Sequence, residues 1–374
     1  MYSVLSYGRM AADPIRIDAY KKAIARAVRP GSIVVDLGCG TGIMSLLALR
    51  AGARRVHAVE MDPAVWLAQD LAVANGHGDK LVVHHCSSYD VSLEERADVI
   101  VADLRGSLPL FGENLAAMKD AKERLLKPGG VLMPARDRLF VALAETDAHR
   151  IDIERGWASF VRNGFDGEPA RLATLNSAYS DEAAPVQANH LLSDAKPWIE
   201  IRYGEPFTRA LSATIDLTMQ RAGTAHALVV WLEATVHDDI VYENRPGNHL
   251  VYKRILLPLL DPVRVSSGDA ARVTLRTDVG GDQWAWDTTI AGGPQVRQAT
   301  FLGLPASPQS LLRESPTATP ARSAVGDRAV RILAMMDGAR SLREIIDELV
   351  ASEAGVRPET IADEVKSCAR RYGR

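Results

Sequence analysis

The sequence predicts an α/β fold in three parts: a doubly wound parallel-sheet domain, an antiparallel β-barrel domain with a helical arm, and a small helical C-terminal domain. Helices and short apolar strands alternate over residues 1–135, whereas strand-like segments follow one another without helices between them over 136–304. A stretch rich in Pro, Ser and Thr over 305–324 is typical of an extended linker, and amphipathic helices fill 325–374. A length of 374 residues fits two or three domains.

The first part contains the elements of a parallel sheet. Pro14 stands in the first turn of a predicted helix, where its missing N–H is tolerated, and Gly52 ends the helix that follows residue 42. The predicted strands lie at 33–37, 56–59, 81–83 and 99–102, and the predicted helices at 15–28, 43–49 and 115–126, the last ended by Pro128-Gly129-Gly130. Because parallel strands present their carboxyl ends at one edge, we expect Asp36, Glu60, Ser87 to Asp90 and Asp103 to converge on one crevice.

A glycine turn follows the first of these strands. Gly38, Gly40 and Gly42 permit a tight turn and close approach of the backbone to a ligand. The next strand ends at Glu60, whose carboxylate can accept hydrogen bonds from the two hydroxyls of an unphosphorylated ribose. The pattern therefore predicts a site for a nucleoside cofactor.

The spacing of the glycines distinguishes between cofactors. A dinucleotide fingerprint reads G-x-G-x-x-G, but here the glycines fall at every second position and Asp36 precedes the first by two residues. This disfavours a nicotinamide oxidoreductase. The pattern D-x-G-x-G-x-G with an acid 24 residues after Asp36 resembles the first two motifs of class I S-adenosylmethionine methyltransferases. The resemblance implies a Rossmann-like methyltransferase domain over 1–135 and S-adenosyl-L-methionine as cofactor.

The second part predicts strands bounded by Gly, Pro and Asp. Repeated strands without helices favour an antiparallel barrel or sandwich over 136–304. A segment of mixed polarity at about 151–195 interrupts the pattern as a dimerisation arm or a lid. The strand-like segments are 138–143, 198–202, 210–217, 227–235, 254–260 and 272–276, and Trp284 and Trp286 are expected to pack inside another strand.

Composition and charge exclude several classes of protein. The net charge of −3 gives no global basic field for nucleic acid, and no run of about 18 apolar residues indicates a membrane span. Cys39, Cys86 and Cys368 lie far apart, which fits a reducing cytoplasm. No secretory signal precedes the first helix. His84 and His85 lack acidic or cysteine partners at metal spacing, so no metal is expected.

The first 300 residues also resemble the protein arginine methyltransferase family. The opening residues are similar to the family's helix over the cofactor, the glycine turn and Glu60 follow its cofactor motifs, and Ala121 to Pro134 is similar to its crossing into the barrel. The resemblance implies that Arg16 clamps the cofactor carboxylate, and it implies a barrel, an arm containing Trp157 and a ring-shaped homodimer. The predicted cofactor-binding residues are Met10, Arg16, Asp36, Gly38, Gly40, Thr41, Gly42, Glu60, Met61, Ser87 and Ser88. Ser87, Ser88 or Tyr89 is expected to approach the adenine, with a simple turn as the alternative.

The acidic loop departs from the family pattern. The family holds a guanidinium with two glutamates after the fourth strand, whereas this chain has Asp103 and, one position beyond the expected spacing, Glu113. Arg105 adds a positive charge where a cationic substrate is expected. Asp103 and Glu113 are predicted as clamps of the substrate. The alternative is that each is an ordinary acid at the end of a strand or the start of a helix.

The loop of the family's Thr-His-Trp motif is altered as well. His249 is the available imidazole and is predicted as a proton acceptor or as a partner of Asp103. Counting back from Asp261-Pro262 instead places Val251 at the histidine position and Tyr252 at the tryptophan position. A loop histidine without a catalytic role is the alternative.

The tail resembles a PqqD-like or winged-helix domain that binds peptides. Its features are an apolar helix, the Asp337-Gly338 turn and a helix capped by Ser341 with Glu344, although the three-strand element of PqqD-like domains is absent from the linker. A generic helical bundle would have the same features. The resemblance implies a precursor peptide as partner and a role in natural-product biosynthesis.

The sequence therefore predicts a cytoplasmic, homodimeric methyltransferase. Its acceptor is a nitrogen of a peptide, protein or natural-product precursor, and a guanidino nitrogen is one variant of this prediction. O- or C-methylation of a small natural product is the first alternative. A non-catalytic peptide-binding scaffold is the second.

Overall fold

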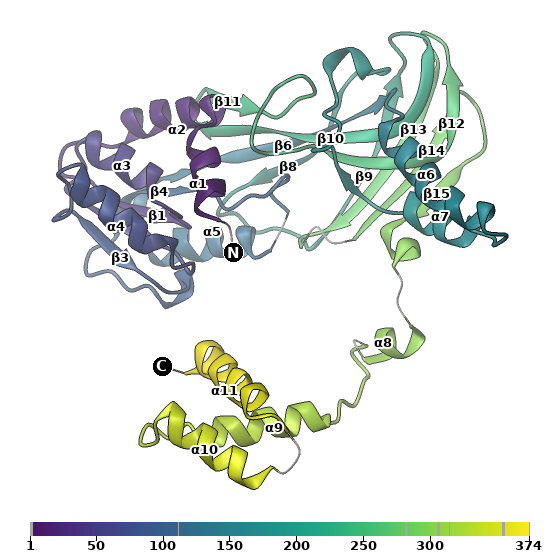
Figure 1. Ribbon diagram of the computed structural model, residues 1–374. Coiled ribbons are helices and arrows are strands. Elements are labelled where there is room, and N and C mark those ends of the chain that lie inside the picture. The colour runs from purple at the N-terminus through teal and green to yellow at the C-terminus, as the bar shows by residue number, and fades with distance from the viewer. Residues whose placement is uncertain are drawn as a thin grey trace. The chain divides into compact units, whose positions relative to one another are not determined.

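A computed structural model describes residues 3–110, 112–280, 283–304, 307–313, 315–353 and 356–373, in which the chain forms two compact units, 1–304 and 305–374 (Figure 1). The boundary predicted at 135/136 lies inside the first unit, between two successive strands. A single cluster of buried residues extends through both halves of this unit.

The first half of unit 1 is a five-stranded parallel sheet in the order β3-β2-β1-β4-β5. Burial of all five residues of β1 explains why this strand reads as a continuous apolar run. The strands are β1 (Ile33–Leu37), β2 (Arg55–Val59), β3 (Leu81–His84), β4 (Ala97–Ala102) and β5 (Leu126–Met133). The helices are α1 (Val4–Ala11), α2 (Pro14–Ala27), α3 (Ile43–Arg50), α4 (Ala64–Ala74) and α5 (Asn114–Arg124), with a 3₁₀ turn at Ser88–Asp90.

One predicted helix end is wrong. Helix α5 ends at Arg124, and Pro128-Gly129-Gly130 lies inside strand β5 rather than after the helix. The strand accommodates this sequence because its register with β4 shifts between Ala97 and Val99. A Cβ at Gly130 would lie 2.8 Å from a methyl carbon of Leu126, so the close packing there requires glycine.

The second half of unit 1 contains two antiparallel sheets, as predicted. The first has the order β7-β12-β10-β6-β8 with β11 beside β10, and the second has the order β15-β14-β13-β9. Contacts of β8 with β9 and of β12 with β14 join them around a common core. The strands are β6 (Arg136–Ala144), β7 (Tyr179–Ser180), β8 (Lys196–Arg202), β9 (Ala210–Thr218), β10 (Gly223–His237), β11 (Ile240–Glu243), β12 (Ile255–Val265), β13 (Ala270–Asp278), β14 (Trp284–Ile290) and β15 (Val296–Ala299).

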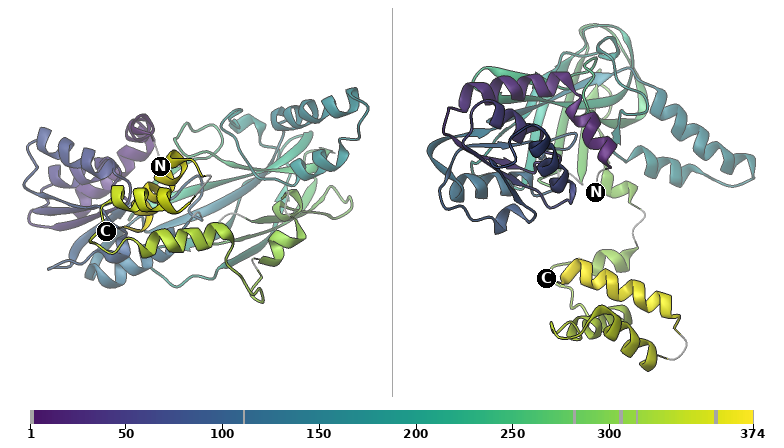
Figure 2. Two further views of the ribbon diagram at one scale, coloured as in Figure 1. Left: turned by 60° about the horizontal axis from the view of Figure 1, so that its bottom comes forward. Right: turned by 60° about the vertical axis from the view of Figure 1, so that its left-hand side comes forward.

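Two helices interrupt the antiparallel half and extend away from it (Figure 2, right). They are α6 (Ala148–Arg162) and α7 (Glu168–Leu175), and they lie within the predicted arm. The indole N–H of Trp157 donates to the Thr174 hydroxyl at 2.9 Å, which joins the two helices. Phe160, Val161 and Phe165 are exposed at this end.

Unit 2 contains helices α8 (Pro308–Arg313), α9 (Ala324–Ala334), α10 (Leu342–Ser352) and α11 (Pro358–Tyr372). The helix α8 corrects the prediction of a wholly extended linker over 305–324. Ser341 and Glu344 form the predicted capping box at the start of α10. The helices α9, α10 and α11 share a core of their own, made of Ile332, Met335, Ile345, Leu349, Ile361 and Val365.

Candidate cofactor and acceptor site

The glycine turn after β1 has the backbone that its sequence predicts. Gly38, Gly40 and Gly42 have φ values of +70°, +52° and +82°, which other residues rarely adopt. The N–H of Gly38 donates to the Val59 carbonyl at 2.8 Å, which ties the turn to β2. A Cβ at Gly40 would lie 2.6 Å from the ring of Tyr7 on α1, so this helix packs directly on the turn.

Glu60 follows the end of β2 and holds the turn from the other side. Its carboxylate accepts from the N–H of Gly40 at 3.0 Å and from the N–H of Asp62 at 2.9 Å. The side chain remains partly exposed, so carboxylate lone pairs are available to a ligand. The carboxylate is thus held just after the end of β2, where the sequence predicts an acceptor for ribose hydroxyls.

Asp36 is buried behind the turn. The hydroxyl of Ser45, on α3, donates to its carboxylate at 2.6 Å. Burial raises the pKa of Asp36 to about 7, because water no longer solvates the charged form. A cationic group of a ligand near this carboxylate would favour its ionised form.

A cavity of about 470 Å³ opens where β1, β2 and β3 end. It contains five of the predicted cofactor residues: Gly38, Glu60, Met61, Ser87 and Ser88. Glu113, predicted to clamp the substrate, lines it too, whereas Asp36, Thr41, Arg16 and Met10 do not. Tyr89, expected near the adenine, lines the cavity as well. The sequence interpretation did not select Leu104, Gly112, Asn114 and Ala117, which reach the cavity from loops and from α5 and carried no motif.

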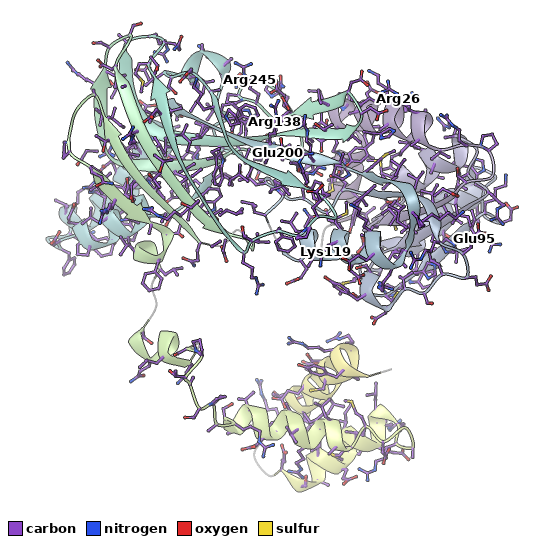
Figure 3. The ribbon with its side chains drawn as sticks, turned by 180° about the vertical axis from the view of Figure 1, so that it is seen from behind. Arg26, Glu95, Lys119, Arg138, Glu200 and Arg245 are labelled. Atoms are coloured by element: carbon purple, nitrogen blue, oxygen red, sulfur yellow. The ribbon has the colours of Figure 1, made fainter. Side chains whose placement is uncertain are left out.

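Two further cavities adjoin one another beside this one, the first along α5 and the second along the end of β8 and the loop that follows it. The first, of about 480 Å³, shares Tyr89, Gly112 and Glu113 with the cavity at the strand ends, and the second, of about 280 Å³, shares Pro206, Phe207 and Val279 with the first. We call the two together the α5 groove. Lys119 and Glu200, labelled in Figure 3, line its two parts.

Arg16 lies near the carboxyl end of β4 and is only 4% exposed. Its guanidinium donates to the Asp103 carboxylate and to the Met10 carbonyl. Its Nε–H has no hydrogen-bond partner within the described part of the chain. Asp13 caps α2 by accepting from the N–H of Arg16 at 3.2 Å, which fixes the start of the helix.

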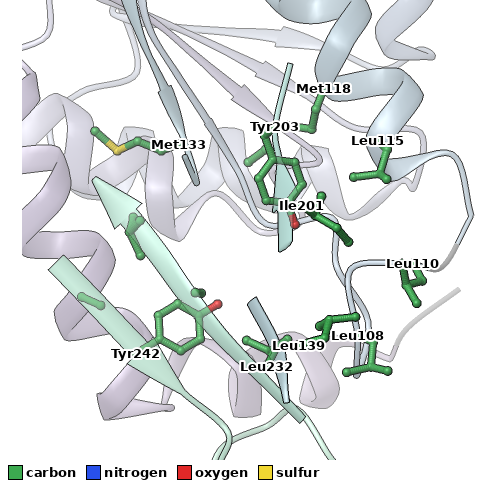
Figure 4. Packing of buried hydrophobic residues seen from close by; sticks show 14 of the residues in the cluster. Leu108, Leu110, Leu115, Met118, Met133, Leu139, Ile201, Tyr203, Leu232 and Tyr242 are labelled. Atoms are coloured by element: carbon green, nitrogen blue, oxygen red, sulfur yellow. The ribbon is translucent and has the colours of Figure 1, made fainter. Parts of the chain in front are cut away.

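Arg105 is enclosed by acidic and aromatic side chains. Its Nε lies 3.3 Å from Asp137, on β6, and 3.9 Å from Asp103. Its other nitrogens donate to the hydroxyls of Tyr242 and, at 3.4 Å, Tyr20. Figure 4 shows Tyr242 and Tyr203 with their hydroxyls directed toward the same interior region, where the Tyr203 hydroxyl donates to Asp137 at 2.7 Å.

The two predicted substrate clamps do not share a cavity. Asp103 is held by Arg16 and lies near Arg105, whereas Glu113 lines the cofactor cavity and the α5 groove. The positive charge of Arg105 is therefore buried among carboxylates from both halves of unit 1. Its position depends on long-range packing that spacing alone does not predict.

The predicted proton acceptor His249 is exposed, and among the described residues it makes no hydrogen bond or ion pair. The N–H of Val251 donates to Asp13 at 2.7 Å, and the ring of Tyr252 lies 5.9 Å from the guanidinium carbon of Arg16. Val251 and Tyr252, which the count from Asp261 selects, are thus the loop residues beside Arg16.

No group of three or more His, Cys, Asp or Glu side chains in the described ranges could hold a metal ion. His57 and His84 form a ring–ring hydrogen bond at 2.9 Å on neighbouring strands. Burial lowers the pKa of His57 to about 4 and also lowers the pKa of His84, which disfavours the charged form of both rings. No helix among the described residues is long and apolar enough to cross a membrane.

Comparison with known proteins places this site in a class. Residues 21–134 match the family described as ribosomal protein L11 methyltransferase (PrmA). A probable protein arginine N-methyltransferase 6 of Arabidopsis thaliana is 37% identical over 151 residues, which are 39% of this chain and 35% of that protein. The matched region thus spans about a third of the length of the first curated relatives.

Other relatives match a longer part of the chain. An arginine N(omega)-methyltransferase of Streptomyces achromogenes subsp. streptozoticus is 28% identical over 277 residues, 71% of this chain and 74% of that protein. The solved heterotetrameric complex of Trypanosoma brucei PRMT1 enzyme and prozyme with AdoHcy has a TM-score of 0.70 at 20% identity, over 78% of this chain and 96% of that one. Arabidopsis thaliana protein arginine methyltransferase 10 has the same TM-score at 19% identity, over 79% and 97%.

The family match over residues 21–134 identifies the parallel-sheet half as a methyltransferase domain, and the solved structures share the fold of a Rossmann-like parallel sheet followed by antiparallel sheets. Within this class, the relatives are named protein arginine N-methyltransferase or arginine N(omega)-methyltransferase, which confirms the resemblance found in the sequence. S-adenosylmethionine is the cofactor of this class.

Proposed function

We propose that the chain transfers the methyl group of S-adenosylmethionine to a nitrogen of an arginine side chain or of a related guanidino compound. The observation that carries the proposal is the cavity at the ends of β1, β2 and β3, where the glycine turn, Glu60 and Glu113 meet. The names of the relatives favour a guanidino nitrogen over oxygen or carbon as acceptor.

The residues of the cavity fit this cofactor. The cofactor supplies a methyl group on a positively charged sulfur, which a nucleophile can displace. Glu60 can accept from the ribose hydroxyls, Ser87 and Ser88 can approach the adenine, and Met61 can pack beside it. Arg16 does not line this cavity, but it lies at the same edge of the sheet, where its Nε–H, unpaired among the described residues, and its fixed charge can bind the amino-acid carboxylate.

Glu113 is the carboxylate that we assign to the acceptor. It lines both the cofactor cavity and the α5 groove, so a group entering along the groove reaches the cofactor beside it. When nitrogen attacks the methyl carbon, the carbon–sulfur bond breaks, its electron pair stays on sulfur and the nitrogen gives up a proton. Glu113 can orient the N–H groups of the acceptor. The role of Asp103 as a second substrate clamp and the role of His249 as the proton acceptor stay predictions.

The acceptor's carrier and the assembly of the chain are also proposals. A groove of two connected cavities fits a peptide or protein segment better than free arginine, and a natural-product precursor bound by unit 2 is a variant of the same proposal. The exposed Phe160, Val161 and Phe165 on the arm support a homodimer. A location in the cytoplasm stays a prediction from the sequence.

Binding and transfer test the proposal together. S-adenosylhomocysteine should bind the chain in calorimetry, and E60Q should lower its affinity by about ten- to a hundredfold, because hydrogen bonds to a charged acceptor are lost. Glu95 gives a matched control, since it is exposed, lies outside the cavity and pairs with Arg54 and Lys127 (Figure 3); E95Q should bind as the wild type does.

Transfer is measured with labelled cofactor against L-arginine, arginine peptides and cell extract, and mass spectrometry locates the methyl group. Methylation of a guanidino nitrogen supports the proposal. Methylation of oxygen or carbon supports the natural-product alternative, and ligand binding with no transfer to any acceptor supports the scaffold. Absence of ligand binding contradicts the assignment of the site.

A further inference from the structure

Four side chains of alternating charge form a row at the end of β4, which we call the ion row: Asp137, Arg105, Asp103 and Arg16. All four are nearly excluded from water, with side-chain exposures of 0%, 1%, 9% and 5% in that order. The charges of the row sum to zero. Asp137 belongs to the antiparallel half of unit 1, and the other three belong to the parallel half.

The Arg16 end of the ion row is incomplete. Its Nε–H is buried and has no partner in the described ranges, although a buried unpaired donor on a charged group costs free energy. An anionic group of a ligand would satisfy it. The ion row therefore ends on a cation with a donor to spare, at the carboxyl edge of the parallel sheet where the ligand cavity also lies.

Asp103 is shared between two guanidinium groups. It bonds to Arg16 directly, and Arg105 lies 3.9 Å from its other oxygen. That oxygen, Oδ1, has no hydrogen-bond partner among the described residues, so it attracts Arg105 without a full hydrogen bond. The charge of Arg105 offsets part of the negative potential that Asp103 produces at Arg16, because the field of the nearby cation opposes that of the carboxylate.

We propose that Arg105 is a positioning residue: by sharing Asp103, it leaves the guanidinium of Arg16 available to the carboxylate of the cofactor. The inference rests on the proposed binding of S-adenosylmethionine. Without the charge of Arg105, Asp103 holds Arg16 alone and competes with the carboxylate of the ligand. The effect is confined to ligands that carry this carboxylate.

The test compares two ligands of the same adenosine thioether type. S-adenosylhomocysteine carries the amino-acid carboxylate, and 5′-methylthioadenosine lacks the amino-acid part. In R105Q the affinity for S-adenosylhomocysteine should fall by about five- to tenfold, while the affinity for 5′-methylthioadenosine stays within about twofold. R105K keeps a positive charge at this position and should therefore restore most of the affinity for S-adenosylhomocysteine that R105Q loses.

A second variant guards against misfolding. R105Q leaves Asp137 without its cation, whereas R105Q/D137N removes both charges and keeps the net charge of the ion row at zero. This double variant should show the same selective loss. Calorimetric titration of each variant with both ligands gives the ratio of dissociation constants, and circular dichroism confirms folding.

If R105Q lost affinity equally for both ligands, Arg105 would only maintain the fold and the proposal would be overturned. The same holds if the ratio of the two dissociation constants in R105Q and R105Q/D137N equalled that of the wild type. If the wild-type chain bound neither ligand, the proposed function would fail and this inference with it. A wild-type chain that binds both ligands with an unchanged ratio in the variants overturns this inference alone.

Discussion

The glycine turn and the ion row meet the same edge of the parallel sheet, but they are built in different ways. The turn and its acid come from 25 consecutive residues, Asp36 to Glu60, and their contacts run between neighbouring strands. The ion row joins residues that are up to 121 positions apart, Arg16 and Asp137, from both halves of unit 1. Short-range patterns therefore specify the cofactor turn, while packing of the two halves specifies the charges beside it.

The two regions also differ in what they cost the fold. The turn uses backbone conformations that glycine adopts freely, so its cost is mainly the flexibility of the unfolded chain. The ion row takes four charges out of water and recovers that free energy only if each charge keeps its partners. A change in the ion row should consequently destabilise unit 1 more than a change in the turn.

The largest expected effect is the removal of one carboxylate from the ion row. D137A leaves Arg105 buried with Asp103 alone at 3.9 Å, and the free energy of unfolding should fall by about 3–5 kcal/mol. D216A is the control, because Asp216 pairs with Arg272 on exposed positions of β9 and β13, and its loss should change the free energy of unfolding far less.

Urea unfolding followed by tryptophan fluorescence measures this difference, since all six tryptophans lie in unit 1. Equal losses for D137A and D216A would mean that the ion row contributes no more to the fold than an exposed pair.

The second effect depends on pH and concerns the turn. The folded-state pKa of Asp36, about 7, lies above its ordinary value of 3.8, so the folded state binds the extra proton between these values. The contribution of Asp36 to stability is therefore fully present below pH 4 and is lost as the pH rises to 7.

D36N removes this dependence. Relative to the wild type, the free energy of unfolding of D36N should rise by up to about 4 kcal/mol between pH 4 and pH 8, a bound set by the size of the pKa difference. Urea unfolding of both proteins across this range measures the difference. A difference that is constant with pH would show that Asp36 titrates normally.

The smallest effect tests the backbone of the turn. Gly42 has φ +82°, and a Cβ there would lie 2.7 Å from the Cβ of Ala68 on α4, so G42A should cost about 2–3 kcal/mol. Gly76 has φ +75° with no atom within 4 Å of such a Cβ, so G76A should cost only about 1 kcal/mol.

Thermal or urea unfolding compares the two alanine variants directly. If G42A were no worse than G76A, close packing of α4 on the turn would contribute nothing, and the left-handed backbone alone would explain the glycine.

The sequence predicted much of this molecule because its elements follow local rules. The glycine turn, the apolar strands and the capping box of α10 each depend on residues within a few positions of one another. The prediction that Pro128–Gly130 ends a helix was wrong, because these residues belong to strand β5, which pairs with β4. The prediction of an extended linker was wrong in part, because the short helix α8 lies within it.

The site itself divides in the same way. Glu60 and the serines after β3 reach the cavity because parallel strands bring their ends together, which follows from strand order alone. The separation of Asp103 from Glu113, and the approach of Tyr252 rather than His249 to Arg16, could not be predicted, since side-chain partners across a domain leave no periodic signal.

By itself, the sequence determined the fold class and, through its resemblance to a methyltransferase family, the cofactor, because the motifs that carry both lie within short stretches of chain. Only the tertiary structure decided which charges neutralise one another. Arg105 lies between Asp103 and Asp137 because the two halves of unit 1 close around it, and the low dielectric of that interior makes its partners matter.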